Sequence, residues 1–419
     1  MNRPTVPGGL EPRDPNRRRS LTNIGGAVTK EGDRADADRL AHALDVPPAT
    51  DAEDDAARGH VHGFHTYPAR MHPITAARLV RAFAPPGGTV LDPFCGSGTV
   101  LVESLVAGRN ARGTDLNPLA VLLAQCKTRP RTPADIDRLV ADAVACAEEA
   151  DARRKAKAGA SRRFSPEDVE LFEPHVLLEL DSLRAKIGTF GGPNRSDLEL
   201  LLSSVLVKLS RKPGDTGWGV RTRRTAGGFA AKLFVQRAQD LAARLSALRV
   251  LLPAPAPTAT VVQDDATDLK RLPPGFVGAV VTSPPYAATY DYIAHHSLRL
   301  RWLGLDPAPL ARGEIGSRTA YARLTPAAAR TAWCRELDRF FRAVGRLLPP
   351  GAPMVLLMAD SAVGDGAIRA DEVAAEVGRA CGLLPAARAS QPRPHFHGPT
   401  ANAFRDRPRF EHALLLRKA

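Results

Sequence analysis

The stretch GTVLDPFCGSGTVLVESLVAGRNARGTDLNPLAVLLAQC, residues 88–126, decides the fold. An apolar strand over 89–91 leads into a glycine-rich turn, which is followed by an amphipathic helix over 99–107 and a second strand over 111–114. A second helix begins at Asn117-Pro118, because Asn favours the N-cap and Pro the first helical position. Strand and helix therefore alternate, which predicts a parallel sheet with a ligand crevice at the carboxyl ends of its strands.

The rest of the chain predicts how this α/β domain is completed. Residues 128–257 break the alternation with helical patterns over 136–147, 197–209 and 229–248, and they end at a proline-rich linker, 253–258. After the linker we expect strands over 259–263, 278–282, 354–358 and 411–416 and helices over 327–347 and 371–380. The pattern predicts one domain, formed by residues 59–127 and 258–419, that is split by a helical insertion at 128–257.

Composition limits the classes of function. The chain has 419 residues, of which 44% are hydrophobic, and its net charge of +13 favours a polyanionic partner. Five scattered cysteines without a CxxC pair predict neither a disulfide framework nor a metal site. Without a signal-like amino terminus or a long apolar run, we expect a cytoplasmic protein that does not contact a membrane. Residues 1–58 predict a mobile arm with at most a short helix around 35–44.

The turn Asp92-Pro-Phe-Cys-Gly-Ser-Gly-Thr99 indicates which ligand the crevice takes. No GK[ST] follows, which argues against a phosphate loop, and GSGTVL lacks the third glycine of a dinucleotide fingerprint. An acidic strand end also repels a pyrophosphate but suits an ammonium or sulfonium group. Asp115, at the end of the next strand, can accept both hydroxyls of a ribose, although a helix-capping role is the alternative. These features favour S-adenosylmethionine.

The segment AVVTSPPYAATYDY, residues 279–292, predicts a second part of the site. Two prolines after an apolar strand force a rigid, extended turn. Such a turn can direct the Ser283 hydroxyl and the Pro284 carbonyl at an exocyclic amine while Tyr286 stacks on the ring that carries it. The alternative is a proline-rich surface loop.

Three motifs together resemble the amino-methylating DNA methyltransferases, which modify cytosine N4 or adenine N6: DPFCGSGT (92–99), TSPPY (282–286) and FHTYPARMHP (64–73). The resemblance implies a Rossmann-like S-adenosylmethionine-dependent methyltransferase sheet, split here by the helical insertion. It also implies DNA methylation in a restriction–modification setting. Because SPPY is commoner among cytosine-N4 enzymes, Ser283 favours cytosine N4 as the target.

The resemblance also implies roles for individual residues. Those expected to bind the cofactor are Tyr67, Pro68, Asp92, Phe94, Gly96, Gly98, Asp115 and Asp265. Asp264 is an alternative to Asp265 at the adenine amine, and we expect His65 and His72 to be structural. The residues expected to form the catalytic base pocket are Ser283, Pro284, Pro285 and Tyr286. The chain has no Pro-Cys pair, so methyl transfer is expected to be direct.

DNA is the expected partner, with its target base flipped out or single-stranded. Since no large carboxyl-terminal recognition domain is left, the insertion is the candidate nucleic-acid reader, with a structural cap as the alternative. Its basic residues are Arg211, Lys212, Arg221, Arg223 and Arg224. Three rival functions remain open: an adenine-N6 DNA methyltransferase, an RNA methyltransferase acting on guanine N2 or adenine N6, and a non-catalytic nucleic-acid-binding protein.

Overall fold

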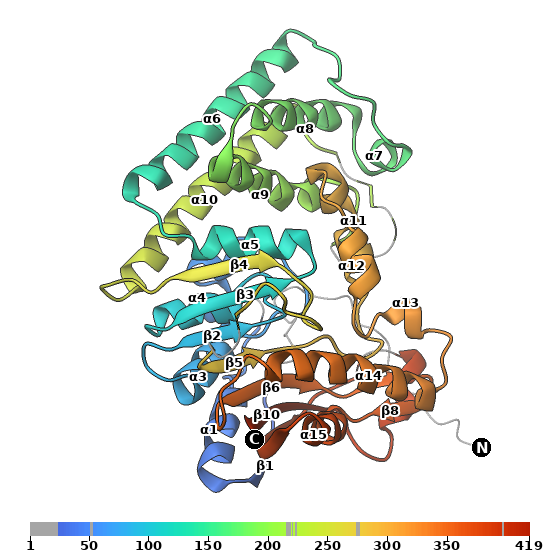
Figure 1. Ribbon diagram of the computed structural model, residues 1–419. Helices are drawn as coiled ribbons and strands as arrows, with labels where there is room; N and C mark the ends of the chain where they lie inside the picture. Colours follow the sequence, from blue (N-terminus) through green and yellow to red (C-terminus); the bar gives the residue numbers. More distant parts are fainter. Residues whose placement is uncertain are drawn as a thin grey trace, which may run out of the picture.

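The computed structural model describes residues 24–50, 53–214, 219, 221–222, 224–273, 277–395 and 398–419. Its centre is an eight-stranded sheet with the order β1-β9-β10-β6-β5-β2-β3-β4 (Figure 1). The parallel strands are β4 (Ala259–Gln263), β3 (Asn110–Asp115), β2 (Thr89–Asp92), β5 (Ala279–Thr282) and β6 (Pro353–Ala359). The strands β10 (Phe410–Lys418), β9 (Leu383–Pro392) and β1 (Thr29–Gly32) continue the sheet antiparallel. The alternation predicts a parallel sheet, which the first five strands confirm, whereas the antiparallel pairing of the last three was not predicted.

The strand order reverses beside β2. The chain passes from β2 to β3 and β4 towards one edge, then returns to β5 on the other side of β2 and continues to β6. Ligands of open α/β sheets bind at such a switch point, outside the carboxyl ends of the strands. Asp92 is the last residue of β2, Asp115 is the last of β3, and Ser283 directly follows β5. The topology therefore brings the two predicted halves of the site together.

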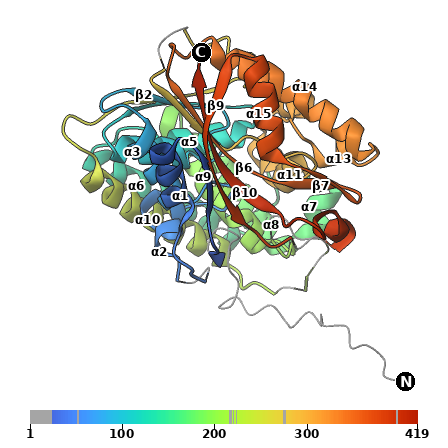
Figure 2. The same ribbon diagram turned by 90° about the horizontal axis from the view of Figure 1, so that it is seen from below.

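Helices cover both faces of the sheet (Figure 2). One face packs against α1 (Arg34–Leu44) and α3 (Pro73–Phe83), and the other against α14 (Pro326–Gly345) and α15 (Ala370–Ala380). Neighbouring residues of a strand serve opposite faces, so Val90 lies in the first core and Leu91 in the second. The β3–β4 half packs with α4 (Thr99–Val106) and α5 (Pro118–Thr128). As predicted, Asn117 caps α5, since its side chain accepts from Leu119 N at 3.1 Å.

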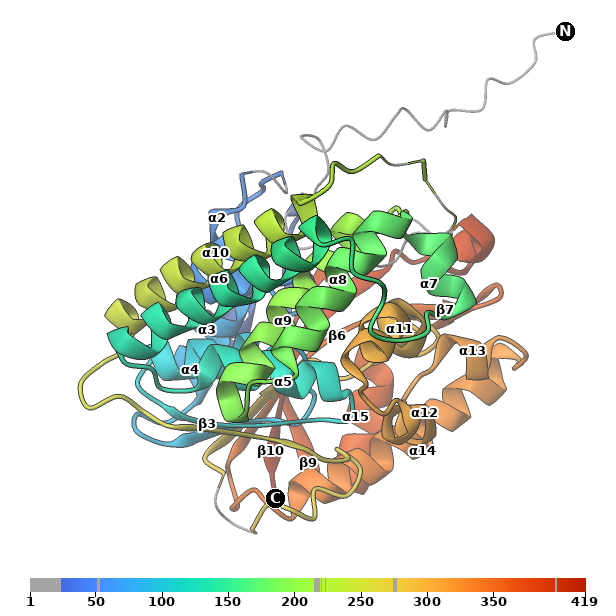
Figure 3. The same cartoon turned by 90° about the horizontal axis from the view of Figure 1, so that it is seen from above.

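Five helices form between α5 and β4 and stack beyond α5 (Figures 1 and 3). They are α6 (Pro133–Lys155), α7 (Pro166–Leu171), α8 (Pro174–Ile187), α9 (Gly192–Leu209) and α10 (Phe229–Leu251). The helices predicted over 136–147, 197–209 and 229–248 lie within α6, α9 and α10. Trp302 of α11 (Tyr292–Leu303) joins this core: it is fully buried, its ring centroid lies 5.7 Å from that of Phe172, and its Nε1 donates to Asp168 at 2.9 Å. The insertion is thus attached to the segment that follows β5.

The short helix predicted around 35–44 forms as α1, but the arm that carries it packs on the sheet in its described part. Strand β1 pairs with β9 at the sheet edge, and Leu40 and Leu44 of α1 are buried against the sheet. All four residues of β1 are exposed, so no apolar alternation marks it as a strand; only the open edge of β9 does. Residues 1–23 lie outside the described part of the chain.

The remaining elements connect these layers. The helices are α2 (Asp55–Arg58), η2 (His60–Gly63), α12 (Ala308–Gly313), α13 (Arg318–Tyr321) and η3 (Gly398–Phe404), and a two-stranded sheet pairs β7 (Ser361–Val363) with β8 (Gly366–Ile368). The sequence pattern did not predict them, nor did it predict β9. None of the helices among the described residues is long and apolar enough to cross a membrane.

Candidate active site

A cavity of about 860 Å³ lies at the switch point of the sheet. The predicted site residues that line it are Tyr67, Asp92, Phe94, Gly96, Asp115, Asp265, Ser283 and Pro285. Four others lie next to it without lining it: Pro68, Gly98, Pro284 and Tyr286. The structure therefore brings residues from the start, the centre and the far half of the chain to one place.

The glycine turn shapes the floor of this cavity. Gly96 and Gly98 have φ of +49° and +84°, a left-handed conformation that other residues seldom adopt. A Cβ on Gly98 would lie 3.0 Å from Ala124 Cα, so this glycine permits close packing of the turn on α5. A Cβ on Gly96 would lie 3.2 Å from the ring of Tyr67. Gly98 thus sets the path of the backbone from behind, while Gly96 faces the cavity.

Asp92 is a buried carboxylate at the end of β2. Its Oδ1 accepts from Thr282 Oγ1 at 2.6 Å and from Phe94 N at 3.2 Å. Burial raises the pKa of Asp92 to about 7, against these hydrogen bonds. Asp92 forms no ion pair with any described residue. A cationic ligand in the cavity would therefore stabilise its ionised form.

Asp115 holds the turn and faces the same cavity. Its two oxygens accept from Gly96 N at 2.9 Å and from Asn117 N at 2.8 Å. Burial raises the pKa of Asp115 to about 6. The N-cap of α5 is Asn117, so Asp115 is not itself the cap, although it binds the backbone beside it. Each carboxylate oxygen has a second lone pair that a ligand hydroxyl can use.

Asp264 and Asp265 also line the cavity, and their hydrogen bonds indicate which of the two is available to a ligand. Both oxygens of Asp264 are used by backbone: Oδ1 accepts from Asp265 N at 3.0 Å and Oδ2 from Arg271 N at 3.2 Å. Asp265 accepts from Thr267 N and Oγ1 at 2.8 Å, both through Oδ1. The geometry favours Asp265 as the ligand-binding carboxylate because its Oδ2 keeps its acceptor capacity.

Tyr67 forms a wall of the cavity. Its ring stacks on His296 with centroids 4.9 Å apart, and its hydroxyl accepts from Asn117 Nδ2 at 3.3 Å. Burial raises the pKa of Tyr67 well above its usual range. His65 Nε2 forms a hydrogen bond with Ser203 Oγ at 2.9 Å, and His72 Nε2 forms one with Asp54 Oδ2 at 3.0 Å. Neither histidine lines the cavity.

The Ser283–Tyr286 turn reaches the cavity through two of its four residues, Ser283 and Pro285. Ser283 Oγ lies 3.3 Å from the Tyr286 hydroxyl, and Trp333 Nε1 donates to the Pro285 carbonyl at 3.3 Å. Tyr286 is half-buried against the core that includes Trp333, so its side chain supports the turn from behind. Thr282, the residue before Ser283, is the donor to Asp92, which connects the two halves of the site directly.

The sequence pattern missed one wall of the cavity. This wall comes from the segment after β5 and is formed by Tyr292, Leu310, Gly313, Glu314 and Ile315. Glu314 Oε1 accepts from Tyr292 N at 2.9 Å, and burial raises the pKa of Glu314. Tyr292 lay within the segment that indicated the site, but nothing in the sequence of 308–315 marks a ligand wall.

A basic groove lies beside the cavity, next to the segment that precedes Tyr67. Its lining combines Gly63–Thr66 with α9, α10, α11 and the segment after α9, and its cations are Lys208, Lys212, Arg221, Arg237 and Arg299. No carboxylate occurs in its described lining. Of the predicted nucleic-acid contacts, Lys212 and Arg221 line the groove, whereas Arg211 and Arg224 do not. Arg223 lies outside the described residues.

With this geometry in place, comparison with known proteins identifies part of the chain. Residues 45–125 match the family model of the N6_N4_Mtase DNA methylases. Over this segment the chain is similar to that family of DNA methylases, and the match covers less than half of the chain. The matched segment contains the Tyr67 wall, the glycine turn and both strand-end carboxylates, Asp92 and Asp115.

Relatives are similar over limited lengths. The type II methyltransferase M.MvaI of Kocuria varians is 40% identical over 84 residues, which are 19% of this chain and 18% of that protein. M.BsoBI of Geobacillus stearothermophilus, also a type II methyltransferase, is 24% identical over 251 residues, 52% of this chain and 48% of that one. This chain therefore spans at most about half the length of these relatives. The solved rRNA methyltransferase aviRa of Streptomyces viridochromogenes is 15% identical, with a TM-score of 0.33 over 90% of this chain and 96% of that one. This TM-score supports no conclusion, so the strand order defines the fold.

The methyltransferase cavity fits S-adenosylmethionine, the methyl donor of this family. Asp92 is a buried carboxylate that a cation would stabilise, as the ammonium and sulfonium of this molecule can do. Asp115 and Asp265 face the cavity with acceptor capacity for ribose hydroxyls and an adenine amine. A nucleotide phosphate would instead meet an excess of carboxylates over cations, which disfavours it. The charged residues in the described lining are Asp92, Asp115, Asp264, Asp265, Glu314 and Arg70.

Proposed function

We propose that the protein transfers a methyl group from S-adenosylmethionine to an exocyclic amine of a DNA base, and that this amine is cytosine N4. One observation carries the proposal. Ser283 of the SPPY turn lines the same cavity as Asp92, and the neighbouring Thr282 donates a 2.6 Å hydrogen bond to Asp92. The amine pocket and the cofactor cavity are therefore adjacent.

The turn supplies acceptors for the amine hydrogens. Ser283 Oγ lies 3.3 Å from the Tyr286 hydroxyl, which orients it, and the Pro285 carbonyl is already engaged by Trp333. This leaves the Ser283 hydroxyl, which lines the cavity, to accept a hydrogen bond from a conjugated amine, which raises electron density on its nitrogen. The Pro284 carbonyl, the second predicted acceptor, belongs to a residue that does not line the cavity. Tyr286 acts in this proposal as the support of Ser283, since it lies outside the cavity lining.

When bound, the cofactor supplies an electrophilic methyl group on a sulfonium. The amine nitrogen would take up this methyl group and would release a proton to solvent, while Ser283 holds the amine at the cavity. Asp92, Asp115 and Asp265 hold the reactants by position and charge, so the acceleration comes from placement and electrostatics. No side chain forms a covalent intermediate in this scheme.

The basic groove supports a nucleic-acid substrate. Its lining carries five cations, of which Arg237 pairs with Asp240 at 2.7 Å, and a basic surface of this kind suits a phosphate backbone. The target base leaves the stack to reach the cavity, because its amine is buried in a duplex. The names of the relatives support DNA and a type II restriction–modification setting.

The decisive experiment measures the product. DNA and RNA from cells with and without the gene are digested to nucleosides and resolved by mass, with Ser283→Ala as the inactive control. We expect 4-methylcytosine in DNA that depends on the intact gene. Finding 6-methyladenine alone would replace the base, and methylated RNA beside unmethylated DNA would replace the substrate class. No gene-dependent methylated nucleoside in either pool would reject the proposal.

A further inference from the structure

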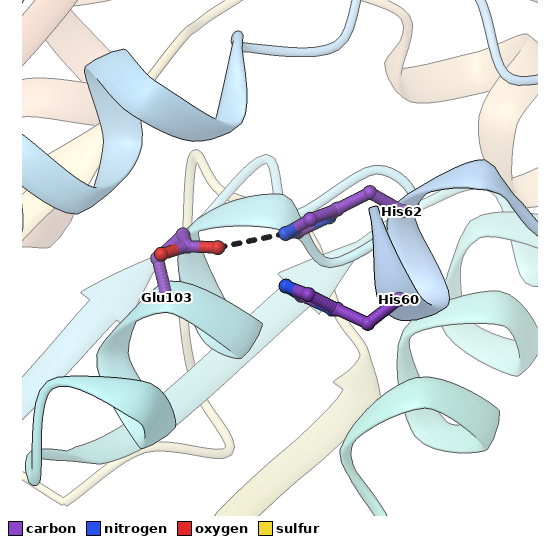
Figure 4. A group of neighbouring side chains, drawn as sticks. All are labelled: His60, His62 and Glu103. Carbon is purple, nitrogen blue, oxygen red and sulfur yellow. Dashed lines mark hydrogen bonds and ion pairs between the residues drawn. The ribbon is translucent and has the colours of Figure 1, made fainter. Parts of the chain in front are cut away.

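Two histidines and a glutamate meet between η2 and α4, away from the cavity lining. His60 and His62 lie on η2, Glu103 lies on α4, and one ligand atom from each lies within 4.8 Å of the others. His62 Nε2 is 2.8 Å from Glu103 Oε1, and the imidazole centroids are 4.5 Å apart. Figure 4 shows the two rings side by side with a nitrogen of each directed towards the carboxylate. The group has the residue types of a transition-metal site.

The burial of the group suits a bound ion. His62 and Glu103 are buried, and the direct partner of the Glu103 carboxylate is His62 Nε2. The Nδ1 atoms of both histidines are buried without a hydrogen-bond partner among the described residues. The φ of His60, +25°, is strained for a non-glycine residue.

Other charged groups face this cluster and bear on cation binding. The buried Lys127 acts on both histidines. Arg70 also acts on His62, and Arg81 acts on Glu103. Arg244 is held by the carbonyls of Arg58 and His60 and by Asp240 at 2.8 Å. None of these cationic side chains, all within the described residues, forms an ion pair with Glu103.

A second cluster with similar residue types shows the contrast. Asp360, Asp371 and His412 also lie within reach of one another. There Arg369 binds Asp360 at 2.8 Å and Arg388 binds Asp371, so guanidinium groups already neutralise the carboxylates. A cation would have to displace them. Among the described residues no arginine or lysine forms an ion pair with Glu103, although Arg81 lies near enough to act on it.

We propose that His60, His62 and Glu103 bind a divalent first-row transition ion such as zinc. Two imidazoles and one carboxylate satisfy three positions of a tetrahedral site, and the half-exposed side of His60 leaves the fourth to water. The ion connects η2, which precedes the Tyr67 wall, with α4, which begins after the glycine turn. Its role is structural, to fix the two parts of the cofactor cavity relative to each other.

The test uses the purified full chain, stripped with chelator and titrated with cobalt(II) and then zinc. His60→Asn removes an imidazole but keeps a residue that tolerates positive φ, and Glu103→Gln keeps an acceptor for His62 while removing the anion. His175→Asn, a partly exposed histidine outside the cluster, is the matched control.

We expect one cobalt per chain with the absorption of a tetrahedral site, displacement by zinc, and a metal-dependent rise in melting temperature. Both cluster variants should weaken binding on the order of tenfold or more, while the control should not. Absence of a cobalt spectrum in the wild type, or equal affinity in all variants, would overturn the proposal. Because no methyl transfer is measured, this result is independent of the proposed catalytic function.

Discussion

Consecutive parts of one short segment, residues 63–71, line the basic groove and the cavity, and these two sites carry opposite net charge. Gly63–Thr66 line the groove, whereas Tyr67 and Ala69–Met71 line the cavity. The elements facing the segment make the difference: strand ends supply Asp92 and Asp115 on one side, and α9–α11 supply lysines and arginines on the other. The charge of each site thus comes from the tertiary neighbours of the segment.

The largest effect is expected on turnover, from the loss of the Ser283 hydroxyl at the proposed amine pocket. Ser283→Ala should lower kcat on the order of 100-fold while leaving cofactor affinity unchanged, because the hydroxyl acts on the amine in the transition state. Steady-state kinetics and calorimetry on the same samples measure both. Ser297→Ala, an exposed serine on α11, is the control. Wild-type turnover in Ser283→Ala would remove the acceptor role of this residue.

The next largest effect is expected on cofactor affinity, from changes to Asp115 in the acidic cavity. Asp115→Ala should weaken S-adenosylmethionine binding by about 1–3 kcal/mol, since ribose hydroxyls lose their acceptor. Asp115→Asn keeps an acceptor for Gly96 N and should lose less, which separates ligand contact from support of the turn. Calorimetry measures both variants. Equal affinity for the wild type and Asp115→Ala would place the ribose contact elsewhere.

The basic side predicts a salt effect. Replacing Lys208, Lys212 and Arg221 with Gln should reduce the slope of log affinity against log salt by roughly 0.9 per lost phosphate contact on duplex DNA. The matched control replaces Arg138, Lys157 and Arg249, exposed cations of the insertion region that do not line the groove. Parallel slopes for the two triple variants would assign the groove a purely structural role.

The smallest effect is on pH dependence. With a pKa of about 7, Asp92 ionises as pH rises from 6 to 8, so affinity for the cationic cofactor should rise by about tenfold at most across this range. Asp92→Asn should show no such rise. In the free protein, folded Asp92 keeps its proton above pH 4 where the unfolded chain releases it, so this residue makes stability fall between about pH 4 and 7. Urea unfolding should show that the free energy of unfolding depends less on pH in Asp92→Asn than in the wild type. An unchanged pH dependence would contradict the raised pKa of Asp92.

Local signals in the sequence predicted the centre of the fold. The apolar strands, the glycine turn and the Asn117-Pro118 helix start each depend on a few neighbouring residues, and all three appear where predicted. The proline turn indicated Ser283, and the resemblance to a family indicated Asp265; both line the cavity. The turn also indicated Pro284 and Tyr286, and the resemblance Pro68, which do not line it, because a motif identifies a turn without saying which side chains point inward.

The sequence by itself therefore determined the parallel sheet, the acidic strand ends and the rigid turn after β5, since each is set by short-range periodicity and backbone restriction. The tertiary structure alone decided the rest. Strand β1 exists because the edge of β9 is open to pair with it, and the wall around Glu314 exists because α11 is packed into the insertion. Likewise, His60 and His62 meet Glu103 only when η2 docks on α4. Contacts between distant segments depend on packing, which short-range sequence patterns do not encode.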